Sequence, residues 1–74
     1  MNQLVANERC DWFLSQFENV GEAVNVMLCD MDEYGIIDAS ANKMLRLASC
    51  PSSPVGERTN AARAAYKRIA AHFN

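Results

Sequence analysis

The sequence has 74 residues, of which 50% are hydrophobic and 22% are charged, and its formal net charge is −2 at pH 7. This composition excludes an intrinsically disordered chain, and the length predicts one domain, residues 1–74, with a thin hydrophobic core. No apolar run approaches the roughly 20 residues that cross a bilayer, and no basic leader precedes an apolar stretch near the N-terminus. We therefore expect a cytoplasmic protein without membrane contact.

The charge is divided unevenly along the chain. Residues 1–38 contain eight acidic residues and one arginine, which gives a formal charge of −7. Residues 39–74 contain one acidic and six basic residues, which gives +5. Opposite charges of this kind can guide two segments together, within one chain or between two chains. We therefore predict an acidic half and a basic half that complement each other. Because so small a chain buries little of its own surface, we also expect a homodimer.

The acidic half has the apolar pattern of a helix. Apolar residues recur at alternating intervals of four and three, which is the spacing of one helix face and not of a strand. They are Ala6, Cys10, Phe13, Phe17, Val20, Val24, Met27 and Met31. The residues that flank this stripe and widen it are Trp12, Leu14 and Leu28. The pattern predicts helix from about residue 3 to residue 32.

A break is expected within this helical stretch. Asn19 followed three residues later by Glu22 resembles the capping box that starts a helix. Gly21 between them costs about 1 kcal/mol inside a helix. One uninterrupted helix would also leave too little chain to cover its apolar stripe. We therefore expect a break or kink near Asn19.

The centre of the chain combines a turn with a further helix. Tyr34-Gly35 is a helix-ending pair, because glycine readily adopts the left-handed conformation that follows a helix. Asp38 or Ser40 can cap the next helix, which we expect to run to Ser49. The apolar residues that we expect it to bury are Ile37, Ala41, Met44, Leu45 and Ala48.

The last helix is predicted over residues 54–73. Residues 50–57 read CPSSPVGE, which is typical of a loop, and Ser53-Pro54 is a suitable cap and first-turn pair. The expected buried stripe consists of Ala62, Ala65, Tyr66, Ile69 and Phe73. The small residues expected to line the remaining surface are Ala61, Ala64 and Ala71. Since no segment alternates like a strand, the sequence predicts an all-α fold, a small bundle of three or four helices.

Residues 30–41, DMDEYGIIDASA, match a calcium-binding loop only in part. An EF-hand loop needs an oxygen ligand at its fifth position and a bidentate glutamate at its twelfth, where this chain has Tyr34 and Ala41. We therefore interpret the segment as an acidic helix end, a glycine turn and a helix cap formed by Asp38.

The sequence predicts no metal, no cofactor and no enzymatic activity. The potential zinc ligands Cys10, Cys29, Cys50 and His72 include no pair two to four residues apart, which structural zinc sites usually have. Three widely spaced cysteines favour a reducing compartment and packed thiols. The chain has one histidine, and it lacks both a glycine-rich phosphate loop and a Gly-x-Ser-x-Gly motif.

Protein binding is the function class that the residues favour. The acidic half carries aromatic side chains beside acidic ones, and its methionines can adapt to irregular surfaces. The candidate partner-binding residues are Trp12, Phe13, Phe17, Glu18 and Glu22. The aromatic residues among them can also belong to the small core, and the two roles are compatible. We therefore expect a small protein whose partner is another protein.

Nucleic-acid binding is the alternative function. The candidate basic surface lies on the last helix and consists of Arg58, Arg63, Lys67 and Arg68. Together with Thr59 and Asn60, these are residue types that contact phosphates and base edges. Three features count against this alternative: an acidic chain, no aromatic residue among the basic ones, and a helix connection too long for a helix-turn-helix.

The basic half also resembles a known domain type. The resemblance is carried by KMLRLASCP, which begins at Lys43, and by GERTNAARAAYKRI, which begins at Gly56. This order of a Leu-x-Leu-Ala helix, a Pro/Ser/Gly loop and an alanine-rich helix is similar to a short helical-hairpin domain of unknown function found in phage and bacterial proteins. The resemblance covers residues 43–69 and carries no catalytic residue. It implies a phage or mobile-element protein that inhibits or modulates a bacterial host protein by contact.

Overall fold

The protein is a bundle of four helices. The computed structural model describes residues 3–73, and side chains from residue 8 onward. The helices are α1 (Gln3–Ser15), α2 (Val20–Tyr34), α3 (Ala39–Ala48) and α4 (Val55–Ala71). The described residues contain no strand, so the predicted all-α fold is confirmed. None of these helices is both long and apolar enough to cross a membrane.

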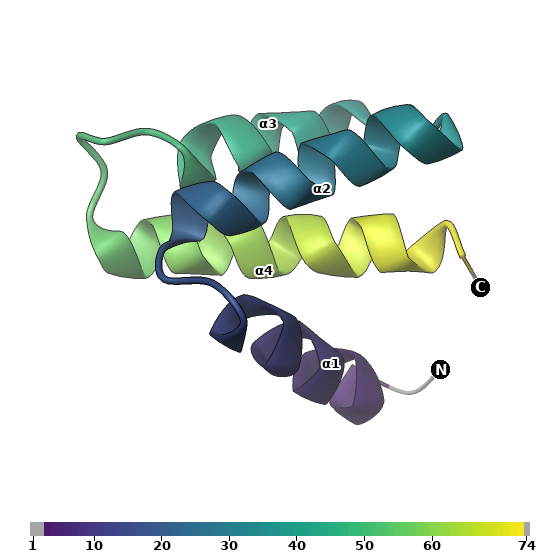
Figure 1. The fold of residues 1–74 in the computed structure, drawn as a ribbon, viewed down its shortest axis with the longest axis horizontal. Helices are drawn as coiled ribbons and strands as arrows, with labels where there is room; N and C mark the ends of the chain where they lie inside the picture. The colour runs from purple at the N-terminus through teal and green to yellow at the C-terminus, as the bar shows by residue number, and fades with distance from the viewer. Residues whose placement is uncertain (1–2, 74) are drawn as a thin grey trace.

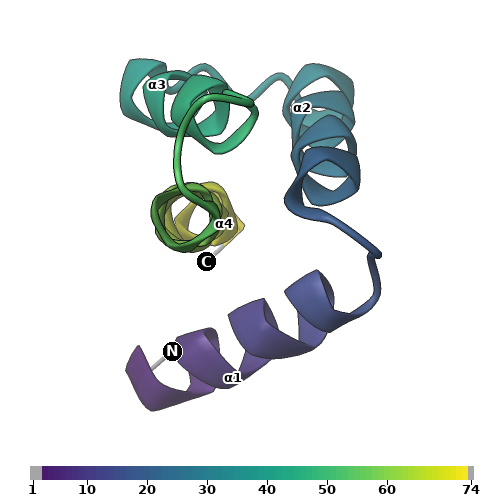
Figure 2. The same ribbon diagram turned by 90° about the vertical axis from the view of Figure 1, so that its left-hand side faces the viewer.

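Helix α4 lies at the centre of the bundle. Figure 1 shows α2, α3 and α4 side by side, with α1 on the other side of α4 and at an angle to it. The view turned by 90° places α2 and α3 above α4 and α1 below it (Figure 2). Helix α4 contacts each of the other three helices. The other helices are therefore held together largely through α4.

The core lies where α2 and α3 meet α4. Small side chains on α3 and α4 let these two helices approach closely, and larger side chains from α2 fill the remaining space. The buried residues are Cys10, Ala23, Val24, Met27, Met31, Ala41, Leu45, Ala48, Ala61, Ala62, Ala65 and Ile69. The half-buried apolar residues that pack against this core are Phe13, Leu14, Phe17, Val20, Ile36, Met44 and Tyr66. The apolar stripe predicted for the acidic half is thus confirmed from Cys10 to Met31, and the side chain of Ala6 lies outside the described residues.

The expected break near Asn19 is confirmed. Helix α1 ends at Ser15, and Asn19 has an extended backbone with φ −148° and ψ 164°. The backbone N–H of Glu22 donates to Asn19 Oδ1 at 3.0 Å, and Glu22 Oε2 accepts from the backbone N–H of Glu18 at 3.3 Å. A side chain on Gly21 would place its Cβ 3.1 Å from Asn19 Oδ1. Glycine therefore leaves room for the capping oxygen, which explains its presence in the first turn of α2.

The turn between α2 and α3 has the predicted form. Gly35 has φ 66°, and its N–H donates to Asp32 O at 3.3 Å, while Ile36 N–H donates to Met31 O at 2.8 Å. These two bonds satisfy carbonyl groups at the end of α2. Asp38 then caps α3, because its Oδ1 accepts from the backbone N–H of Ala41 at 3.0 Å. The interpretation of residues 30–41 as helix end, turn and cap is therefore correct.

Four predictions about burial were wrong. Ile37 is 93% exposed, because it lies in the short connection between α2 and α3 and not on a helix face. Phe73 is 57% exposed, because α4 ends at Ala71 and the chain no longer follows the helical stripe. Trp12 is 67% exposed, and Leu28 is also exposed, because each lies too far around its helix from the core. The apolar faces of α1 and α2 are therefore narrower than the sequence pattern suggests.

The start of α4 also differs from the prediction. Ser53 does not cap the helix: Pro54 occupies the N-cap position, with φ −58° and ψ 146°, and no side chain bonds there. Pro54 O accepts from the backbone N–H of Arg58 at 3.0 Å, which is the first helical bond. Ala61 is buried and not on the surface, because α4 is covered by helices on more than one side.

Ion pairs connect the acidic half to the basic half. Arg63 of α4 forms a salt bridge with Asp11 of α1. Arg68, near the end of α4, pairs with Asp38 at the start of α3, with Nε 3.2 Å from each carboxylate oxygen. Both pairs join a residue of the basic half to one of the acidic half within one chain. The predicted complementarity therefore operates at least within the chain, although surface ion pairs of this kind contribute little to stability.

Candidate functional site

An apolar groove opens between α1, α2 and α4. Its volume is about 240 Å³. The lining residues are Phe13 from α1, Met27 and Asp30 from α2, and Tyr66, Ile69, Ala70 and Phe73 from α4 and the residues just beyond it. All but Asp30 are apolar or aromatic. The groove is therefore an apolar surface with one carboxyl group, that of Asp30, in its lining.

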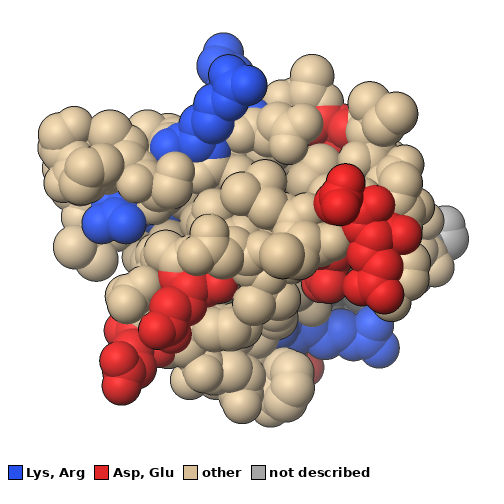
Figure 3. Space-filling model, turned by 45° about the horizontal axis from the view of Figure 1, so that its top comes forward, with Lys and Arg blue, Asp and Glu red and all other residues tan. Residues whose placement is uncertain are grey.

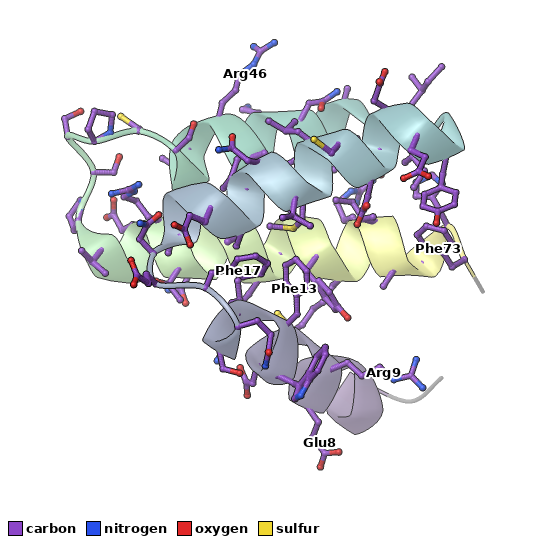
Figure 4. The ribbon with its side chains drawn as sticks, viewed as in Figure 1. Glu8, Arg9, Phe13, Phe17, Arg46 and Phe73 are labelled. Atoms are coloured by element: carbon purple, nitrogen blue, oxygen red, sulfur yellow. The ribbon has the colours of Figure 1, made fainter. Side chains whose placement is uncertain are left out.

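The crossing of α1 over α4 creates this groove. Cys10 is the buried contact of α1, and its Sγ lies 4.0 Å from Arg63 O of α4. Phe13 and Phe17 point from α1 toward α4 (Figure 4). Because α1 crosses α4 at an angle and does not run alongside it, space remains between Phe13 and the end of α4 (Figures 1 and 2).

Aromatic rings form one wall of the groove. The Phe13 ring centroid lies 5.1 Å from that of Phe17, with the planes at 62°, and 5.1 Å from that of Tyr66, with the planes at 35°. These are favourable distances for aromatic pairs, which hold one another in place. Burial raises the pKa of the Tyr66 phenol, so this wall carries no charge at neutral pH.

A second aromatic pair lies at the far end of the groove. The rings of Tyr34 and Phe73 meet edge to face, with centroids 5.2 Å apart and planes at 87°. Tyr34 is 60% exposed, and Phe73 is more than half exposed. Phe73 lies in the turn just beyond α4, where its N–H donates to Ala70 O at 3.0 Å, and it extends the lining that Tyr66 and Ile69 form on α4. The apolar surface therefore continues from a buried floor to an exposed end.

The α2 edge of the groove is acidic. Helix α2 contains Glu22, Asp30, Asp32 and Glu33 and no lysine or arginine. Asp30 lines the groove, and Glu33, one turn further on, lies on the same side of α2. Within residues 8–73, neither side chain forms a salt bridge. Acidic side chains gather on the right of Figure 3, where α2 ends.

Helix α1 carries charges of both signs. Arg9 extends outward from α1 and Glu8 points away from the rest of the bundle (Figure 4). The positive charge of Arg9 partly opposes the effect of burial on the pKa of the Tyr66 phenol. Neither Arg9 nor Glu8 is among the groove-lining residues, so the charged residue that lines the groove is Asp30 of α2.

No protein-family model, curated protein or solved structure matches this chain. The resemblance of residues 43–69 to a helical-hairpin domain of phage and bacterial proteins therefore stays a prediction. Function has to be inferred from the chain's own geometry.

The predicted partner-binding residues are divided between two places. Phe13 and Phe17 lie together and are half-buried, with Phe13 lining the groove. Glu18 and Glu22 lie together at the start of α2, where the Glu22 carboxylate accepts a backbone bond. Trp12 is largely exposed on α1 and is not among the groove-lining residues.

The predicted basic surface is spread over different parts of the molecule. Arg58 Nε donates to Ala48 O at 2.8 Å, at the end of α3. Arg63 and Arg68 pair with acidic residues of α1 and of the α2–α3 connection, as described above. Lys67 is half-buried on α4, and its charge acts on the buried Cys10 thiol. The structure therefore does not bring these four side chains together on one face.

The cysteines have different environments. Cys10 is buried, as predicted, and burial raises the pKa of its thiol. The prediction of packed thiols was wrong for Cys29, which is exposed, and for Cys50, which is half-buried in the α3–α4 loop. The Ser52 hydroxyl lies 3.1 Å from Cys50 Sγ, and this hydrogen bond, together with smaller contributions from the Ser52 backbone and from Ser53, lowers the pKa of Cys50 to about 7. No group of three or more His, Cys, Asp or Glu residues that could hold a metal occurs in the described part of the chain.

Sequence reasoning missed most of the groove. The sequence predicts Tyr66, Ile69 and Phe73 as one buried stripe, which is confirmed for Ile69, holds in part for half-buried Tyr66 and is wrong for Phe73. The prediction does not show that the three also line an open groove. An apolar stripe that another helix covers and an apolar stripe that stays open have the same sequence spacing, so the spacing cannot distinguish them. Asp30 gave no signal beyond its position in an acidic helix.

Proposed function

We propose that the protein is non-enzymatic and acts by binding another protein, with the groove between α1, α2 and α4 as the contact surface. The observation that carries this proposal is the open groove itself. Apolar and aromatic side chains from three helices line it, and the rings at its end remain exposed. A contiguous apolar surface bordered by charged residues is typical of protein interaction sites.

Burial of a partner side chain in the groove would stabilise the complex. Phe13 and Tyr66 are half-buried, and both line the groove, so part of each ring is available to a partner. Covering apolar surface is worth about 25 cal/mol per Å², so an apolar side chain placed in the groove is stabilised there. Met27 in the floor is unbranched and can change its rotamer to fit such a side chain.

The finer part of the proposal concerns the source of the partner. The resemblance of residues 43–69 implies a phage or mobile-element protein, and on that ground the proposed partner is a bacterial host protein that is inhibited or modulated by contact. The groove supports the proposal that the protein binds another protein. The proposal that this partner is a bacterial host protein is supported by the resemblance alone.

Nucleic-acid binding has less support as a function. Arg63 and Arg68 are each paired with a carboxylate, and Arg58 donates to a backbone carbonyl oxygen. Cations that already have anionic partners must give these up before they can neutralise phosphates, which weakens salt-dependent binding. This alternative is therefore one of the outcomes of the experiment below and is not a second proposal.

The experiment is an affinity capture from bacterial lysate that compares two matched variants. Ala70→Phe adds a ring inside the groove, because Ala70 is one of its lining residues. Ala71→Phe adds the same ring one position further along α4, where the side chain is exposed and does not line the groove. Thermal unfolding of both variants confirms that they are folded. Each capture is repeated after nuclease treatment.

We expect a stoichiometric protein partner that survives nuclease treatment, is retained by Ala71→Phe and is lost by Ala70→Phe. Loss of all captured material after nuclease treatment would contradict the proposal and support nucleic-acid binding. Equal capture by the two folded variants would show that the groove is not the contact surface.

A further inference from the structure

We infer that the groove binds an amphipathic helix of the partner protein, oriented so that lysine or arginine side chains on one flank of that helix lie along α2. This inference rests on the proposed function, because it specifies the segment of the partner that occupies the same groove. It rests on the shape of the groove, on the charge of its α2 edge and on the position of α3.

The shape of the groove fits a helix. Its floor follows α4 from Tyr66 through Ile69 to Ala70, and Phe73 lines it from the turn that follows the helix. A bound helix places apolar side chains three, four and seven residues apart along one face, so it can lie along such a floor. The other common way of binding a peptide is to extend a sheet, and the described residues contain no strand that could be extended.

The charge of the α2 edge fixes the orientation. Asp30 lines the groove, Glu33 follows it one turn later on α2, and neither has an ion-pair partner within residues 8–73. A helix with cations on the flank that faces α2 matches this edge. Such complementarity contributes more to specificity and to the association rate than to affinity.

A second copy of this chain fits the groove less well. The exposed basic helix that it could offer is α3, where Lys43, Met44 and Leu47 line a surface hollow. Helix α3 and the groove lie on opposite sides of α4 (Figure 2). Seating α3 of one copy in the groove of another would therefore give head-to-tail contacts, which do not close into a dimer. The occupant is accordingly a different protein.

The test uses designed peptides as probes and the full chain as receptor. One 18-residue helical peptide has a leucine stripe with lysines on its flanks, and a second has the same stripe with glutamates. Binding is measured by calorimetry at 0.15 M salt, and the position of each peptide is mapped by the chemical shifts of the Met27, Ile69 and Ala70 methyl groups. We expect the lysine peptide to bind about tenfold or more tightly than the glutamate peptide, with shifts at these three methyl groups.

The receptor variants separate the α2 edge from general acidity. Asp30→Lys combined with Glu33→Lys reverses the edge charge and should weaken lysine-peptide binding by about tenfold or more. The milder pair Asp30→Asn and Glu33→Gln should give a smaller loss of the same sign. Asp32→Lys is the matched control, because Asp32 is exposed on the same helix but lies about 160° around it from Asp30 and about 100° from Glu33. We expect this control to change binding less than threefold.

Several results would overturn the inference. One is equal binding of the lysine peptide to the Asp30/Glu33 variant and to the Asp32 variant. A second is chemical-shift changes outside the groove. A third is assemblies of the protein that grow with its concentration and disappear in Ala70→Phe, because these would show that a second copy occupies the groove. If lysate capture depends on Ala70 but the lysine peptide neither binds nor competes with the captured protein, this inference is wrong while the proposed function stands. If capture is independent of Ala70, it is the proposed function that fails, so the two failures are distinguishable.

Discussion

Arg68 Nε lies 3.2 Å from both carboxylate oxygens of Asp38, and this contact connects the end of α4 to the start of α3. The same carboxylate caps α3 through the backbone N–H of Ala41, and His72 Nε2 lies 3.3 Å from its second oxygen. Asp38 therefore receives donors from two helices at once. These bonds, of which the backbone bond is the largest cause, lower the pKa of Asp38 to about 2 from an ordinary value of 3.8.

The first prediction concerns acid stability. A carboxylate whose pKa is lower in the folded state than in the unfolded state stabilises the fold above its unfolded value and loses this contribution as the pH falls through the folded value. The contribution of Asp38 is therefore present at pH 4 and above and disappears between about pH 4 and pH 2. Urea unfolding from pH 2 to pH 6 measures it.

Asp38→Asn is the control for this prediction. Asparagine keeps an oxygen that can cap α3 but has no charge for Arg68. We expect the wild-type protein to be more stable than this variant at pH 6 and equally stable near pH 2. A difference that stays constant over this pH range would show that the charge of Asp38 is not the cause.

The second prediction compares two glycines. Gly35→Ala should lower the free energy of unfolding by about 1 kcal/mol or more, because Gly35 has φ 66°. Gly56→Ala should raise it by about 0.4–1 kcal/mol, because Gly56 lies in the first turn of α4 without a positive φ and a Cβ there meets no atom within 4 Å. Denaturant unfolding at neutral pH measures both, and effects of the same sign would contradict the described turn.

The third prediction separates two neighbouring aromatic residues of α1. Phe13→Ala removes the ring contacts with Phe17 and Tyr66 and should destabilise the protein by about 2 kcal/mol. Trp12→Ala should change stability by less than about 0.5 kcal/mol, because Trp12 is largely exposed. Fluorescence gives an independent check: Trp12 is the single tryptophan, and its emission should shift little on unfolding. A large red shift on unfolding would place Trp12 in the core.

The fourth prediction concerns thiol reactivity. Cys50 should react with iodoacetamide at a rate that rises through about pH 7, because the thiolate is the reactive form and the bond with Ser52 stabilises it. Buried Cys10 should react only on unfolding. Mass spectrometry of labelled peptides gives the rate for each thiol. Ser52→Ala should move the Cys50 profile to higher pH, and an unchanged profile would rule out this hydrogen bond as the cause.

The fifth prediction is the homodimer expected from the small core and the divided charge. Light scattering at two protein concentrations should give a mass near twice that of the chain at the higher one. The ion pairs of Asp11 and Asp38 within one chain already use part of the complementary charge. A mass of one chain at both concentrations would contradict the dimer. It would show that the opposite charges of the two halves are paired within one chain and not between two chains.

Local signals in the sequence predicted the helix ends well. Asn19, Gly35 and Asp38 each act within four residues along the chain, by capping or by adopting a particular φ, so neighbouring residues reveal their roles. The break, the turn and the cap of α3 could therefore be predicted. Ser53 was a comparable signal and was misleading, because Pro54 occupies the position where a capping side chain would lie.

The groove could not be predicted in the same way. It exists because α1 crosses α4 and leaves Tyr66 and Phe73 partly uncovered, and a crossing angle depends on contacts between distant residues such as Cys10 and Arg63. Helical periodicity identifies the apolar face of α4 but does not indicate how much of that face a neighbour covers. The exposure of Trp12 has the same origin, since it depends on which side of α1 meets α4.

The central position of α4 has a consequence for synthesis of the chain. Each of the three earlier helices packs on α4, so α1, α2 and α3 leave the ribosome before the surface that they cover exists. Until Ala62, Ala65 and Ile69 have also emerged, the apolar faces of the earlier helices have no complete core to enter. A nascent chain that stops within α4 therefore lacks the packing surface that α1, α2 and α3 share. Truncation there removes tertiary contacts from all three helices.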